Sequence, residues 1–176
     1  MLNSIINIQI SEAANPTEPV GLSDSKLQAI VDHANDNDYI TSLIKKCRQE
    51  FESICGISIV EKNIVLIADW NREQQLPYPP IKGINDVKIK TGVATGGSAE
   101  YETPSCYSID GGFFDLSSCN RLKITYTTGM TTVPEDLKLA LLNLIAFRYA
   151  NRGDHSVELT DDVKSQILKF KDYSWS

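Results

Sequence analysis

The sequence has little of the residue types that carry catalysis or hold metal ions. Only two of its 176 residues are histidines. These two, His33 and His155, form neither an H-E-x-x-H motif nor a triad, and we interpret each as a solvated residue near a helix end. The glycine-rich segment 92–99 has the glycine spacing of a P-loop, but Ser98 replaces the lysine that would bind phosphate. We therefore expect no catalytic residue, no cofactor and no metal, and we predict that the protein is not an enzyme.

Cysteine is also scarce, and the four cysteines form no C-x-x-C pair. Cys47 and Cys55 fall on one predicted helix, about 12 Å apart along its axis, which is too far for a disulfide within that helix. We interpret them as small buried thiols in a reducing compartment. The sequence leaves open whether Cys106 and Cys119 are close in space.

Long apolar runs are missing as well. No window approaches the roughly 18 to 20 uninterrupted apolar residues of a membrane span, and the first residues have no basic region typical of a secretory signal. The composition, with 41% hydrophobic and 23% charged residues, is typical of one globular domain with a real core. We expect a protein made in the cytoplasm that binds no membrane.

Basic charge is limited, because 17 lysines and arginines face 23 acids and leave a net charge of −6. This balance argues against a protein that grips the nucleic-acid backbone. The acidic excess is concentrated before residue 39, where Lys26 is the only base, and its simplest interpretation is a solvated N-terminal region. The six acids of this region are Glu12, Glu18, Asp24, Asp32, Asp36 and Asp38.

What the chain does have is helical periodicity at both ends. Residues 1–19 read as an arm and linker, because prolines interrupt their second half. From Ile40 to Cys55 apolar residues recur with helical spacing, while Arg48 and Glu52 fall on the opposite, polar side. The predicted helices span approximately residues 23–34, 38–55, 134–151 and 160–170.

Between the second and third helices the composition changes to β-branched residues and turn signals over 57–128. Strands are expected at about 57–69, 86–90, 106–109 and 122–127. The predicted fold class is α+β: a bundle of about four helices with a small antiparallel β-sheet domain inserted between the second and third. One domain would then span 20–170, followed by a tail at 171–176.

Two segments look suited to contacts between subunits. The third helix carries leucines in most directions around its axis, so one packing face cannot cover them all. Three prolines in segment 76–81 form a stiff spacer that holds Tyr78 outward or against a neighbour. The candidate subunit-interface residues are Leu139, Leu142, Tyr149 and Tyr78.

The order of several short motifs resembles a known family. The motifs are Leu76-Pro-Tyr-Pro-Pro-Ile81, Ile124-Thr-Tyr-Thr-Thr-Gly129, Val133-Pro-Glu-Asp-Leu137 and the helix end Tyr149-Ala-Asn-Arg152. Together, over residues 19–153, they resemble the head-tail connector (adaptor) proteins of tailed double-stranded DNA bacteriophages. The resemblance implies a structural virion protein at the head-tail interface, whose copies form a ring, typically dodecameric, beneath the portal.

The resemblance also implies partners: other copies of the chain, the portal protein, a stopper or tail-terminator protein, and DNA that passes through without specific binding. On this interpretation the six N-terminal acids are candidates for the DNA channel. The candidate partner-ring loop consists of Gly92, Thr95, Gly96, Gly97 and Ser98. The candidate portal-docking residues are Phe170, Tyr173 and Trp175, which could instead fold back on their own domain.

Two alternatives stay open at this point. One is another role in the same neck, as a tail-completion or stopper protein. The other, from a different class, is a small hydrolytic enzyme with an acidic site of unfamiliar pattern.

Overall fold

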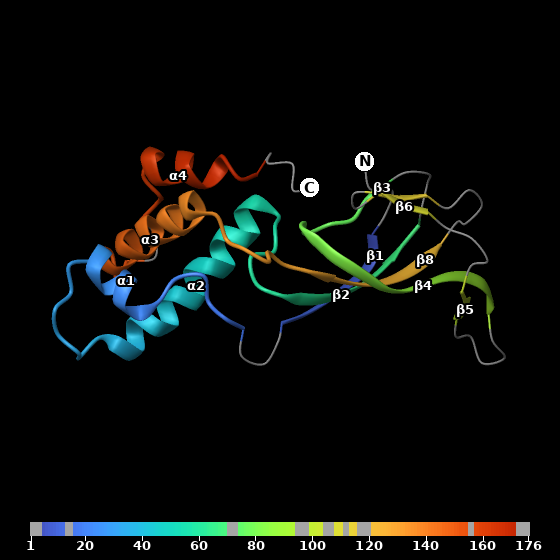
Figure 1. The fold of residues 1–176 in the computed structure, drawn as a ribbon, viewed down its shortest axis with the longest axis horizontal. Coiled ribbons are helices and arrows are strands. Elements are labelled where there is room, and N and C mark those ends of the chain that lie inside the picture. The colour runs from blue at the N-terminus through green and yellow to red at the C-terminus, as the bar shows by residue number, and fades with distance from the viewer. Residues whose placement is uncertain are drawn as a thin grey trace. The chain divides into compact units, whose positions relative to one another are not determined.

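The structure is a computed structural model that describes residues 5–12, 16–69, 74–93, 99–103, 108–110, 113–115, 121–154 and 157–171. The chain divides into two compact units (Figure 1). The helical unit comprises Thr17–Val60 and Thr131–Trp175, and the sheet unit comprises Met1–Pro16, Glu61–Met130 and the last residue. The α+β class is confirmed, and every described strand except the first, which precedes the helices, lies between the second and third helices in chain order.

Four helices form the helical unit: α1 (Leu22–Gln28), α2 (Asn37–Cys55), α3 (Glu135–Ala150) and α4 (Asp161–Leu168). The first ends earlier than the expected boundary near residue 34, because Ile30 adopts a φ of 56°, which a right-handed helix cannot continue. The second ends, as expected, at Gly56, whose φ of 69° suits the left-handed position after a helix.

The core of the helical unit lies between α2, α3 and α4. The apolar stripe of α2 is buried as predicted, with Ile40, Cys47 and Phe51 at 0% exposure. Phe170, just beyond α4, packs its ring 5.8 Å from that of Phe51. In contrast, Leu139 on α3 is 54% exposed, so this apolar helix is not fully covered by the residues of its own unit that the structure describes.

The sheet unit contains a five-stranded antiparallel sheet in the order β1-β2-β8-β4-β5. Its strands are β1 (Ile5–Glu12), β2 (Lys62–Ala68), β8 (Leu122–Thr128), β4 (Ile81–Val93) and β5 (Ala99–Glu102). A second, three-stranded sheet joins β3 (Gln74–Gln75), β7 (Phe113–Asp115) and β6 (Ser108–Asp110). The segment interpreted as an N-terminal arm thus contributes an edge strand, paired along β2 with Ile8 opposite Leu66.

Alternate residues of β2 and β8 form the sheet core, where Leu66 faces Ile124 and Ile64 faces Tyr126. The Tyr126 hydroxyl donates to the Pro77 carbonyl at 3.0 Å, and Tyr78 packs against the same cluster. The proline segment therefore covers one side of the sheet.

The expected strand start at residue 57 is wrong. Residues 57–60 are buried in the helical unit and form no strand, because Glu52 binds the backbone N–H groups of Ile59 and Val60. Within the described ranges, no helix combines the length and apolarity that crossing a membrane requires.

Candidate interaction sites

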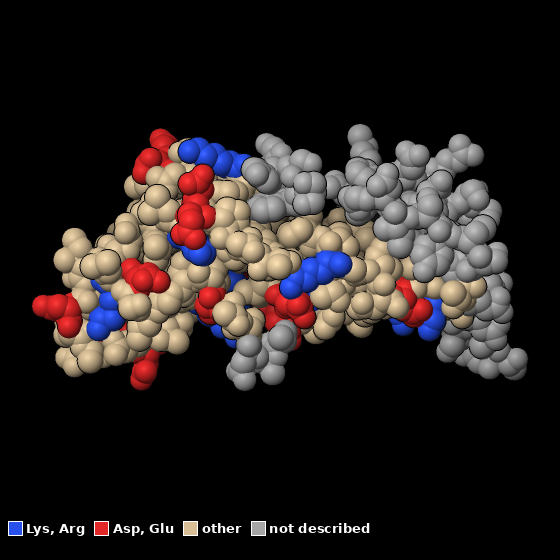
Figure 2. Space-filling view, in the orientation of Figure 1, with Lys and Arg blue, Asp and Glu red and all other residues tan. Residues whose placement is uncertain are grey.

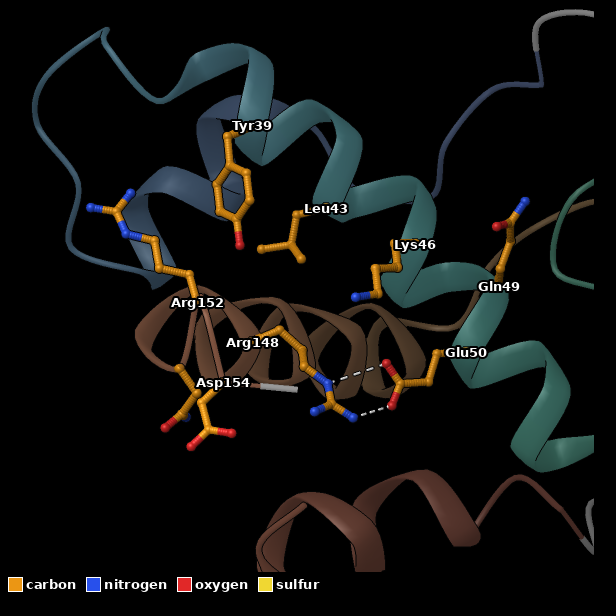
Figure 3. A pocket seen from close by; sticks show the side chains of 9 residues that line it. Tyr39, Leu43, Lys46, Gln49, Glu50, Arg148, Arg152 and Asp154 are labelled. Carbon is orange, nitrogen blue, oxygen red and sulfur yellow. Dashed lines mark hydrogen bonds and ion pairs between the residues drawn. The ribbon is translucent and has the colours of Figure 1, made fainter. Parts of the chain in front are cut away.

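A groove of about 460 Å³ lies in the helical unit between α2 and the C-terminal end of α3 (Figure 3). The side chains of Tyr39, Leu43 and Lys46 line it from α2, one or two helical turns apart on the same face. Its remaining lining residues are Gln49, Glu50, Arg148, Asn151, Arg152 and Asp154.

Aromatic and charged groups hold one wall of the groove in place. The ring centroids of Tyr39 and Tyr149 lie 6.1 Å apart, and the Arg152 guanidinium lies 5.1 Å from the Tyr149 centroid. Asp36 accepts hydrogen bonds from the Tyr149 hydroxyl at 2.6 Å and from Arg152 at 2.8 Å. These two hydrogen bonds lower the pKa of Asp36, and the bond to Asp36 raises the pKa of Tyr149. The carboxylate is therefore ionised, and the phenol protonated, at neutral pH.

The basic side chains that line the groove differ in their hydrogen-bond and ion-pair partners. Arg148 forms a bidentate ion pair with Glu50 and donates to the Val157 carbonyl at 3.2 Å. Arg152 is held by Asp36. Lys46 is exposed and makes no hydrogen bond or ion pair with another described residue. The groove thus offers one available positive charge beside an aromatic surface, which suits a segment carrying both an acid and an apolar side chain.

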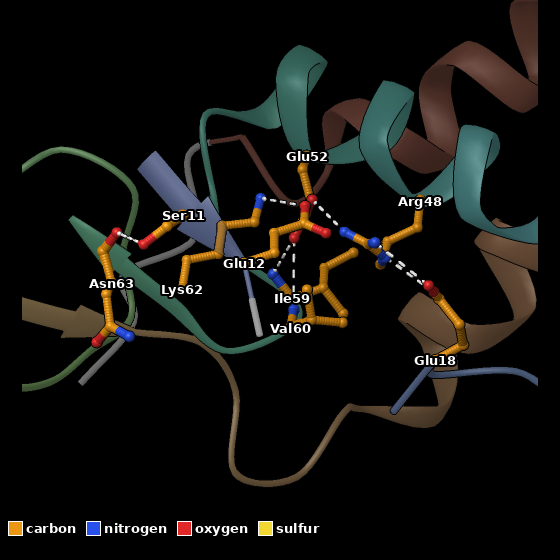
Figure 4. A network of polar contacts seen from close by, with 9 residues as sticks. All are labelled: Ser11, Glu12, Glu18, Arg48, Glu52, Ile59, Val60, Lys62 and Asn63. Carbon is orange, nitrogen blue, oxygen red and sulfur yellow. Dashed lines mark hydrogen bonds and ion pairs between the residues drawn. The ribbon is translucent and has the colours of Figure 1, made fainter. Parts of the chain in front are cut away.

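A second polar site is centred on Arg48, which is 0% exposed (Figure 4). Its guanidinium donates to Glu18 at 2.8 and 3.2 Å and to Glu52 at 2.9 Å. The second oxygen of Glu52 accepts from the backbone N–H groups of Ile59 at 2.7 Å and Val60 at 3.4 Å. Within the helical unit, the network therefore fastens the first residues after the chain enters at Thr17 and the last before it leaves at Val60.

This network was missed from the sequence, which placed Arg48 and Glu52 on the solvated side of α2. The structure buries both, with Glu52 at 4% exposure. Their spacing of four residues was a signal for a helix ion pair, but burial depends on the segments around residues 18 and 59, whose position no helical periodicity reveals.

The six acids proposed for the DNA channel differ in their exposure and in their ion-pair partners. Glu12 forms an ion pair with Lys62 at 3.7 Å in the sheet unit, whereas Glu18 and Asp36 are engaged by arginines in the helical unit. Three others, Asp24, Asp32 and Asp38, are exposed. On the face seen in Figure 2, acidic and basic side chains of described residues are interspersed rather than gathered in one basic patch. A channel role for these acids stays a prediction.

The remaining candidate residues have different surroundings. Leu139 is exposed, Leu142 and Tyr149 are half-buried, and Tyr78 packs on the sheet core. Gly92 lies in β4 opposite Glu100. Outside the described residues lie Thr95, Gly96, Gly97, Ser98, Tyr173 and Trp175, together with His155, Cys106 and Cys119.

Phe170 requires a correction as a portal-docking candidate. It is 8% exposed and packs against Phe51, so it belongs to the core of its own unit. The expectation of buried thiols is confirmed for Cys47 and Cys55. Among the described residues, no three His, Cys, Asp or Glu side chains cluster as metal ligands would.

The two-unit α+β fold matches chains of gene transfer agent particles. A chain in the neck of an empty gene transfer agent particle, computed with C6 symmetry, superposes with a TM-score of 0.70 at 14% identity over 93% of this chain and 95% of that one. A chain from the virion of the native gene transfer agent gives 0.69 at 14% identity, with 92% and 94% covered. A chain from the native neck computed with C12 symmetry gives 0.57 at 17% identity, with 89% and 94% covered.

The sequence itself defines the family. The model of the head completion protein family matches residues 23–160, and the chain belongs to that family. A comparison with curated proteins finds no significant match. Family and fold together confirm the predicted resemblance to head-tail connector proteins.

Proposed function

We propose that the protein is a structural subunit of a phage neck, whose copies form a ring that joins the portal of a DNA-filled head to the tail. The observation that carries this proposal is the match to the head completion family over residues 23–160. The fold shared with chains of gene transfer agent necks over more than nine-tenths of their length agrees with it.

The surfaces of the helical unit support a role in assembly. Leu139 is 54% exposed on a helix whose other apolar side chains are mostly buried, and the groove between α2 and α3 presents an aromatic ring beside the available Lys46. Exposed apolar and aromatic groups of this kind are typical of protein interfaces. The portal above and a stopper or tail-terminator protein below are the partners that the connector role requires.

The charge of the chain supports a conduit for DNA. At −6 per copy the protein has no electrostatic reason to hold the phosphate backbone, so a ring of such copies lets the genome slide. Copies arranged around a channel would add their negative charges, and the exposed acids of the helical unit are the candidates for its lining.

The test uses DNA-filled heads that were assembled without this protein. The purified full-length chain is added, and the necks are imaged by cryo-electron microscopy. We expect a closed ring of the added protein in direct contact with the portal. Density found only below another ring would assign the protein to the stopper position, and heads that bind no added protein would overturn the proposal.

A further inference from the structure

One helix of this protein presents two different surfaces on opposite sides. On α3, Leu139 and Arg148 are nine residues apart, which places them about 180° apart around the helix axis. Leu139 is exposed to solvent, whereas Arg148 lines the groove against α2. The two surfaces belong to the same unit, so their relation does not depend on where the sheet unit lies.

The exposed surface combines an acid with an apolar group. Asp136 and Leu139 lie three residues apart on one face of the first turns of α3, and both are exposed. Asp136 makes no hydrogen bond or ion pair with another described residue, unlike Glu135, which pairs with Lys138 at 2.6 Å. We call Asp136 and Leu139 the donor face.

The groove is complementary to the donor face in both respects. Lys46 is exposed and lies three residues after Leu43 on one helical face, but Leu43 itself is only 5% exposed. The ring of Tyr39, 40% exposed and one turn before Leu43, therefore provides the apolar surface of this face. When two helices run antiparallel, Asp136 opposite Lys46 brings Leu139 to the level of Leu43, one turn from Tyr39, whose exposed ring it can cover. One register therefore satisfies the charge pair and the apolar contact together.

We propose that the groove between α2 and α3 of one copy receives the donor face of α3 from a neighbouring copy, with Asp136 pairing with Lys46 and Leu139 covering the exposed ring of Tyr39. The contact joins two different surfaces, so it is heterologous, and repeating it around an axis builds a ring rather than a two-fold dimer. The inference rests on the proposed ring and names the contact that closes it.

Charge reversal tests this pairing, using the head-binding assay with full-length protein. In Lys46→Glu the groove repels Asp136, and in Asp136→Lys the donor face repels Lys46. For each variant alone, we expect that about tenfold or more protein is needed before half of the heads carry a ring. An equimolar mixture of the two is expected to return to within about threefold of the wild type, because alternating copies make every contact complementary.

Matched controls keep the charge change and move its position. Lys45→Glu changes the exposed neighbour of Lys46 that does not line the groove, and Asp161→Lys changes an exposed acid at the start of α4. Both are expected to assemble like the wild type, and circular dichroism checks that all four variants are folded.

The outcomes separate the inference from the function beneath it. If wild-type rings form and the single variants assemble normally, the pairing of Asp136 with Lys46 is wrong. If neither the single variants nor their mixture form rings on the heads, the groove binds a different partner, and the proposed contact between copies is overturned. If the wild type forms no ring, the proposed function falls, and the inference falls with it.

Discussion

Breaking the buried ion pair of α2 provides a quantitative test of the structure. Glu52→Gln removes the charge that faces Arg48, which is fully buried, while keeping the length of the side chain. The neutral amide has one oxygen to share between the guanidinium at 2.9 Å and the N–H groups of residues 59 and 60. Removing one partner of a buried pair costs about 3 to 5 kcal/mol. Because Glu18 still faces Arg48, we expect the lower end, about 3 kcal/mol.

The chain supplies a matched control on another helix. Glu135 also forms an intrahelical pair, with Lys138, but its side chain is 85% exposed. Glu135→Gln should therefore cost only about 0 to 1 kcal/mol. Urea unfolding followed by circular dichroism at a helix wavelength measures both, and thermal unfolding should show a loss of about 6 to 12 °C for Glu52→Gln. Equal losses for the two variants would refute the structural role assigned to the Arg48 network.

Three further predictions concern single features. Burial raises the pKa of Cys47 to about 12 and that of Cys55 to about 11. Peptide mapping after iodoacetamide treatment at pH 8 should therefore find both thiols unmodified until urea is added. Fast labelling of either thiol in the native protein would contradict their burial. Hydrogen bonds from Tyr149 and Arg152 lower the folded-state pKa of Asp36, so its stabilising contribution is present at neutral pH and lost as pH falls below about 4. Asp36→Asn should remove that part of the acid dependence in unfolding curves, and curves of unchanged shape would contradict it. Deleting residues 171–176, which include Tyr173 and Trp175, should abolish attachment to DNA-filled heads without changing the melting temperature; a lower melting temperature with retained attachment would assign the tail to the core.

The helices and the order of the units were predictable because they depend on local patterns. The apolar stripe of α2, the glycine at its end and the proline before α3 are each visible over a few residues, and all three appear in the structure. The edge strand β1 was harder to foresee, since its partner β2 lies about fifty residues away and the register follows from that pairing alone. The groove combines side chains from α2 and the end of α3, and no spacing within either helix indicates that Lys46 and Arg152 line one hollow.

The excess of apolar residues on α3 acquires a physical explanation when burial is compared position by position. Leu137, Leu141, Leu144 and Ile145 are each 0% exposed, which is what the core of the helical unit requires. Leu139 gains little from folding, because more than half of its side chain remains in contact with water. A polar residue there would serve the isolated subunit at least as well. The position therefore makes physical sense as part of a surface that is covered after folding, and Leu139→Ser should leave the unfolding free energy within about 0.5 kcal/mol of the wild type while weakening assembly on heads. A loss of fold stability comparable to that of Glu52→Gln would instead show that Leu139 already completes its own core.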